Sequence, residues 1–239
     1  IELFKSQNVA LKEIIYNTLS KPNENRKVIS DGVFDYEGYL KSKVKILWIM
    51  KEPYDYPDGT GGDWHIADIY KKEKKDKKDK YGNARTTWYP IINVSHSILA
   101  GLKSFDKTQK MTKGNKIVEL ALSHIAYINI QKLPSKGREK TNNSDIHEAF
   151  KDKVQNDFLK EQFKLINPDV IIGGNTLGMM FEHFGLKGEN LKMNPTYNSY
   201  IVGEKLFINA NHPASRTNKE KYINNILTAV VIWRNKKWY

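Results

Sequence analysis

Three polar side chains, each at or just after the end of a short apolar run, are the candidates for chemistry in this sequence. Glu52 follows the run Ile46–Met50, Asn129 lies near the end of the next apolar run, and His212 comes shortly after Leu206–Ile208. A carboxylate fixed beside a buried strand can orient water or stabilise a developing cation, and an amide can bind the edge of a base. An imidazole can donate to an oxygen that gains negative charge as a bond breaks.

Each of these side chains also has a structural alternative. Glu52 could form an ion pair with Lys51 or with another lysine nearby, and Asn129 could cap a loop. A single histidine is most often structural. Pro213 fixes the backbone after His212 and sets the direction of the imidazole, and the surrounding string of polar residues favours a functional role.

Two further groups are weaker candidates for contacts with nucleic acid. Gly173, Gly174 and Asn175 precede a predicted helix, where free backbone N–H groups favour phosphate, although a Gly-Gly turn is also common packing. Trp88 and Tyr89 offer flat surfaces on which an unpaired base could stack. Aromatic residues at the start of an apolar helix more often belong to the core.

Short apolar runs alternate with helical patterns along the chain. The predicted strands are Lys45–Met50, Ala126–Ile130, Asp169–Ile172 and a hairpin of Tyr200–Val202 with Leu206–Ile208. The predicted helices are Gln7–Ser20, Trp88–Leu102, Lys116–Leu122, Ile146–Ile166, Asn175–Phe184 and Lys219–Arg234. This alternation predicts a three-layer α/β/α fold with a central, mainly parallel four-stranded sheet. Ligands of such sheets bind at the carboxyl ends of the strands, where the candidate residues stand.

The length of 239 residues predicts a single domain over 1–239. We expect an N-terminal helical extension at about 1–40 and a basic loop excursion at about 55–85. This excursion contains Lys71–Lys80, whose seven lysines and three acids predict a solvated segment. No apolar run approaches the roughly 20 residues of a membrane span, so we expect no membrane partner.

The balance of charges favours a polyanionic partner. The chain has 39 lysines and arginines against 27 acidic residues, a net charge of +12. Such an excess attracts nucleic acid, although a lysine-rich proteome would give the same composition. The absence of cysteine excludes disulfides, thiolate nucleophiles, and zinc or iron–sulfur clusters held by cysteine, and it fits a reducing cytoplasm.

Taken in order, these motifs resemble those of the uracil-DNA glycosylase superfamily. Its first motif, Gly-Gln-Asp-Pro-Tyr in one branch, corresponds to Met50–Tyr54 here, and its later His-Pro-Ser motif corresponds to His212–Arg216. Between them the family has an asparagine that ends a strand, as at Asn129, and an apolar strand with glycine before a helix, as at Val170–Gly174. Order and spacing agree over roughly Lys45–Arg234.

This resemblance implies a DNA glycosylase that hydrolyses the N-glycosidic bond of uracil or a related damaged base flipped out of single- or double-stranded DNA. Glu52 would position the hydrolytic water or stabilise the oxocarbenium-like sugar, Asn129 would bind the pyrimidine edge, and His212 would stabilise the leaving base. Tyr54 would crowd the 5-position of the base, and an aromatic side chain such as Trp88 or Tyr89 would stack on it.

The resemblance also implies that Ser215 and Arg216 press on the DNA strand and that no metal or organic cofactor is required. The chain departs from the family pattern at Met50 in place of glycine, at Glu52 in place of aspartate and at Ala214 in place of serine. Two alternatives stay open: a protein of the same fold that binds nucleic acid or a modified nucleotide without cleaving it, and an α/β hydrolase or transferase that acts on a free nucleotide or another small anion. We expect a monomer.

Overall fold

The computed structural model describes residues 1–19, 27–53, 65–66, 85–102, 116–134, 143–190 and 197–237. Tyr54 and Lys71–Lys80 lie outside these residues, as does most of the basic excursion predicted at about 55–85. Among the helices of the described segments, none has both the length and the hydropathy that crossing a membrane requires.

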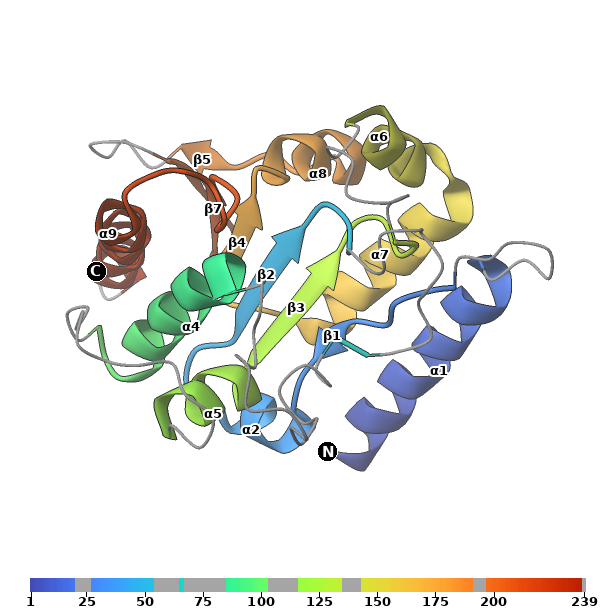
Figure 1. Cartoon of the computed structure of the whole chain (residues 1–239), viewed down its shortest axis with the longest axis horizontal. Helices are drawn as coiled ribbons and strands as arrows, with labels where there is room; N and C mark the ends of the chain where they lie inside the picture. The colour runs from blue at the N-terminus through green and yellow to red at the C-terminus, as the bar shows by residue number, and fades with distance from the viewer. Residues whose placement is uncertain are drawn as a thin grey trace.

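A mixed β-sheet lies at the centre of the molecule (Figure 1). Its strands are β1 (Gly32–Val33), β2 (Ile46–Met50), β3 (Ile125–Asn129), β4 (Val170–Gly174), β5 (Glu189–Asn190), β6 (Asn198–Val202) and β7 (Lys205–Ala210). Their order across the sheet is β1-β3-β2-β4-β7-β6-β5. The four strands β3, β2, β4 and β7 are parallel, as the sequence predicted.

Antiparallel strands extend this parallel core on both sides, so the sheet has more strands than the four that the sequence predicted. On one side β1 pairs with β3, and on the other β6 and β5 follow β7. The hairpin of β6 and β7 was predicted, and Gly203 takes a positive φ of 60° in its turn. Strands of two residues, such as β1 and β5, are too short to show an alternating pattern in the sequence.

The helices of the described chain are α1 (Glu2–Leu19), α2 (Tyr36–Lys41), α4 (Arg85–Leu99), α5 (Lys116–Ser123), α6 (Asn143–Lys151), α7 (Lys153–Ile166), α8 (Leu177–Phe184) and α9 (Lys219–Lys237). The sequence predicted one long helix over Ile146–Ile166, and this prediction is wrong. The chain breaks at Asp152, whose backbone is extended and whose carboxylate accepts a hydrogen bond of 2.9 Å from the N–H of Gln155. Asp152 thereby caps α7, and the apolar pattern that continues on either side hides the break.

Two apolar clusters place helices on both faces of the sheet. Ile46, Trp48 and Met50 pack with residues of α4, α5 and α9, on what we call the α4–α9 face. Leu47 and Ile49 pack with residues of α6, α7 and α8, on what we call the α7–α8 face. Since successive side chains of a strand point to opposite faces, strands buried on both sides are apolar throughout, which is the pattern seen in the sequence.

Candidate functional site

The carboxyl ends of the parallel strands β3, β2, β4 and β7 form one edge of the sheet, which we call the rim. Asn129 is the last residue of β3 and pairs in register with Met50, the last residue of β2. Glu52 follows β2 by two residues and His212 follows β7 by two residues. Neighbouring strands lie about 4.8 Å apart, so Asn129 and Glu52 belong to adjacent strand ends and His212 to a strand end about 10 Å from that of β2. The fold therefore brings the three candidate residues to one edge.

Side-chain alternation decides which face of the sheet the rim residues point to. Tyr127, two residues before Asn129 on β3, belongs to the apolar cluster of the α4–α9 face, and so does Met50. Gly174 ends β4 beside them: a Cβ atom there would lie 2.5 Å from the sulfur of Met50 and 3.5 Å from Cδ of Pro213. The buried Met50 side chain thus fills the space between the ends of β2 and β4 and the loop after β7.

The side-chain amide of Asn129 is the most unusual group at the rim. Asn129 is 0% exposed, and neither Oδ1 nor Nδ2 forms a hydrogen bond with any residue that the structure describes. The backbone is fixed, because its N–H donates to Oδ2 of Asp31 at 2.7 Å. A buried amide without partners costs about 1–3 kcal/mol, and bound water or a ligand with a complementary amide edge would remove that cost. The side chain therefore does not cap a loop of the described chain, and its role in binding stays a prediction.

A buried ion pair beneath Asn129 holds its backbone in place. The Lys132 Nζ lies 2.8 and 2.9 Å from the two carboxylate oxygens of Asp31. The Gln162 amide joins both partners: it accepts from Lys132 and donates to Asp31, each at 2.9 Å. Burial lowers the pKa of Lys132 more than the attraction of Asp31 raises it. Sequence reasoning missed this group, and the one available signal was a lysine two residues after the apolar run that contains Asn129.

His212 lies half-buried in the loop after β7, in a defined protonation state. Its Nδ1 accepts a hydrogen bond of 3.1 Å from the N–H of Ala214, so the neutral ring carries its proton on Nε2. Burial is the first cause that lowers the pKa of His212, and the positive charges of Lys51 and Lys219 lower it further. A neutral imidazole with its proton on Nε2 can donate a hydrogen bond to an atom that becomes anionic.

The two lysines near His212 also anchor the surrounding segments. The Nζ of Lys51 donates to Oδ1 of Asn143, the first residue of α6, at 2.7 Å. The Nζ of Lys219 donates to two backbone carbonyls of the loop after β7, both at 2.6 Å. This part of the rim therefore combines a fixed backbone with positive charge, which suits an anionic ligand.

Glu52 stands between Asn129 and His212 along the rim. Its side chain is 8% exposed, and the neighbouring Pro53 is buried as well. Carboxylates are rarely this buried, because removal from water disfavours their charged form. The burial of Glu52 matches the expected partial desolvation, and its part in catalysis stays a prediction.

The segment Gly173–Asn175 is tied into the sheet and helix. Gly173 and Gly174 are the last residues of β4, and the N–H of Asn175 donates to a carbonyl of β7 at 2.7 Å. The N–H of Leu177, at the start of α8, donates to Oδ1 of Asn209 at 3.2 Å. The N–H of Asn175, one of the groups that we expected to face phosphate, is thus already bonded, and a contact of this segment with DNA stays a prediction.

The remaining predicted residues differ in how accessible they are. Trp88 is 4% exposed, and its ring centroid lies 5.2 Å from that of Tyr127 in the core, which matches the alternative of a packing role. Tyr89 is only partly buried at the margin of the same cluster and is the better placed of the two for stacking on a base. In the loop after β7, Ser215 is partly buried and Arg216 is exposed.

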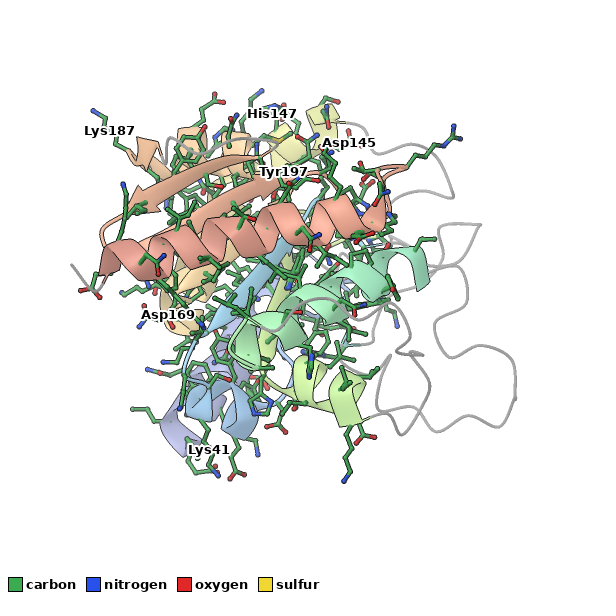
Figure 2. All side chains as sticks on the ribbon, turned by 90° about the vertical axis from the view of Figure 1, so that its left-hand side faces the viewer. Lys41, Asp145, His147, Asp169, Lys187 and Tyr197 are labelled. Atoms are coloured by element: carbon green, nitrogen blue, oxygen red, sulfur yellow. The ribbon has the colours of Figure 1, made fainter. Side chains whose placement is uncertain are left out.

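The described residues also surround a cavity of about 890 Å³ at the opposite edge of the sheet. Its lining includes Lys41, His124, Asp169 and Trp233, and none of the candidate residues. In Figure 2 Lys41 lies at the bottom of the molecule and Asp169 lies above it on the left. The cavity is therefore separate from the rim.

Neither a scan of protein-family models nor a search of curated proteins finds a match to this chain.

Proposed function

We propose that this chain is a DNA glycosylase of the uracil-DNA glycosylase fold type, which hydrolyses the N-glycosidic bond of uracil or a related damaged base flipped out of DNA. The observation that carries the proposal is the buried amide of Asn129, which has a fixed backbone and no side-chain hydrogen bond within the described chain. Uracil presents a carbonyl oxygen and an N–H side by side on its pairing edge, and these complement an amide donor and acceptor.

In this proposal His212 and Glu52 act on opposite sides of the breaking bond. The bond between the sugar C1′ and the base nitrogen breaks with its electrons passing to the base, and the Nε2–H of His212 donates to the base oxygen that becomes negative. Glu52 stabilises the positive sugar and accepts a proton from the water whose oxygen bonds to C1′. A histidine that is already neutral keeps its donor through this step, which is consistent with the lowered pKa of His212.

The partner in this proposal is DNA, single- or double-stranded. The net charge of +12 favours a polyanion, and at the rim Lys51 and Lys219 lie close enough to His212 to lower its pKa. Positive charge beside the proposed pocket favours a base that belongs to a strand over a free base. We further propose that the protein acts as a monomer in the cytoplasm, the compartment that a sequence without cysteine fits.

The direct test is incubation of the full chain with single- and double-stranded oligonucleotides that carry one uracil, followed by cleavage at abasic sites with alkali. Glu52→Gln and His212→Asn should each lower the single-turnover rate by about 10²- to 10⁴-fold. Glu119→Gln, at an exposed position of α5, and His124→Asn, at the far edge of the sheet, are matched controls that should keep the full rate. If no deaminated base yields an abasic site, the glycosylase proposal is wrong.

A second candidate function is binding of nucleic acid or a modified nucleotide without cleavage. Met50 favours it, because its buried side chain occupies space beside Gly174 and Pro213 that a glycine at position 50 would leave open. This candidate predicts salt-dependent binding of DNA with no turnover and with no change in affinity in Glu52→Gln. Turnover that is lost in Glu52→Gln would exclude it.

A further inference from the structure

Three side chains that can ligate metal meet between α6 and α8, on the face of the sheet opposite to Asn129. They are His147 from α6 and Glu182 and His183 from α8, and each offers a ligand atom within 4.8 Å of those of the other two. The helices α6 and α8 lie side by side at the top of Figure 1, and Figure 2 shows His147 at that end of the molecule. Phe150, whose ring stacks on that of His183, belongs to the apolar cluster of the α7–α8 face. The group is therefore separate from the proposed base site.

The ring of His183 is held in one orientation by stacking, as a metal ligand requires. It stacks on Phe150 with centroids 4.6 Å apart and planes 9° from parallel. Its Nε2 is buried and forms no hydrogen bond with the part of the chain that the structure describes. A buried ring nitrogen loses its hydration and needs another partner, and a metal ion bound to the cluster would supply one.

The chemistry of the three groups selects the class of ion. Two imidazoles and one carboxylate are a common ligand set of Zn²⁺, which takes four ligands in a tetrahedral arrangement. Bond lengths of about 2.0–2.2 Å place tetrahedral ligand atoms roughly 3.4 Å apart, so the groups must approach one another further on binding. Glu182 is exposed, and a change of its rotamer meets little resistance.

We propose that His147, Glu182 and His183 bind a zinc ion that joins α6 to α8. The helix α6 has nine residues and is separated from α7 at Asp152, and helices of that length are marginal without tertiary contacts. Its first residue, Asn143, accepts the hydrogen bond from Lys51 at the rim. The ion therefore fixes a short helix whose amino end borders the proposed DNA site, and water completes its coordination.

The test uses the full chain, stripped with a chelator and titrated with Zn²⁺ against a chromophoric competitor. We expect one equivalent to bind and the melting temperature to rise with Zn²⁺. Co²⁺ in place of Zn²⁺ should give the visible absorption bands of a tetrahedral site. His147→Ala and His183→Ala should each weaken binding at least 100-fold, while His124→Ala, at the far edge of the sheet, should leave it unchanged.

Glu182→Gln tests the site in a variant that should still fold, because the residue is exposed and the change removes only a charge. It should weaken binding about tenfold or more, with the circular dichroism of the wild type. Binding of less than one equivalent, or equal affinity in the His147→Ala and Glu182→Gln variants and in the wild type, would overturn the proposal. Glycosylase activity is not a readout of this test, so its outcome is independent of the proposed function.

Discussion

Asn129→Leu should make the protein more stable and at the same time inactive. Leucine has the same branched arrangement of four side-chain heavy atoms as asparagine, is larger and has no polar atoms, so the substitution removes a buried amide that forms no side-chain hydrogen bond within the described chain. The largest gain is the cost of that unsatisfied group, about 1–3 kcal/mol, and the strain of fitting the larger leucine reduces it. For a chain of this length 1 kcal/mol corresponds to about 2–4 °C, so the melting temperature should rise by roughly 2–12 °C. The hydrogen bond from the backbone of residue 129 to Asp31 does not depend on the side chain.

The matched control is Gln162→Met, the same kind of substitution at a buried amide that has its partners. Gln162 accepts from Lys132 and donates to Asp31, so its loss leaves both ions short of a hydrogen bond and should lower stability by about 1–3 kcal/mol. Urea unfolding of the two variants and the wild type, with equal m-values, gives the two differences. Overpacking by leucine costs about 1–3 kcal/mol, so a net loss of more than about 2 kcal/mol in Asn129→Leu would mean that the amide has a partner in the free protein, and the argument for a preformed base-binding group would fail.

Three further predictions concern the support of the rim. Asp31→Asn should cost about 3–5 kcal/mol in urea unfolding, because it leaves the Lys132 ammonium buried without its counter-ion, and adding Lys132→Met should recover part of the loss. Gly174→Ala should cost about 1–3 kcal/mol by crowding the sulfur of Met50, and Met50→Ala should relieve that crowding. The pKa of His212 is lowered from 6.5, so below pH 6.5 the unfolded state binds more protons than the folded state. The free energy of unfolding should therefore fall as the pH drops below 6.5, and it should fall less steeply in His212→Gln.

The parallel core of the sheet could be predicted because its strands are short, apolar and buried on both faces. Ile46–Met50 and Val170–Ile172 carry that pattern without interruption, and the hairpin turn at Gly203 is marked by its glycine. The break at Asp152 could not be predicted in the same way, because α6 and α7 are both amphipathic and the apolar positions continue past it. A capping carboxylate ends a helix through a single hydrogen bond, so it does not alter the spacing of apolar residues from which helices are predicted.

The sequence predicted which candidate residues lie at the ends of strands, but it did not predict the side chains that hold Asn129 in place. Asn129 was identified because it closes an apolar strand, a local feature of the sequence. Its position depends on Asp31, and the lysine that neutralises Asp31 is paired with Gln162 from α7. These partners are far apart in the chain, so only the fold brings them together. Trp88 is a different case, because the residue itself was misleading. The sequence does not distinguish an aromatic side chain that packs in the core, as Trp88 does, from one that faces a ligand.

The buried ion pair costs free energy, because two charges are removed from water to hold the end of β3. That cost suggests that the direction of the Asn129 side chain must be fixed. Apolar side chains of equal volume would hold β3 and α7 together as well as Asp31, Lys132 and Gln162 do, without the cost of removing two charges from water. They could not accept the N–H of Asn129, and the amide beyond it would then lose the support that fixes its direction. A group meant only to fill space would not need that support. An amide that meets the edge of a base, as we propose for Asn129, would need it, because such contacts require placement to within about 0.5 Å.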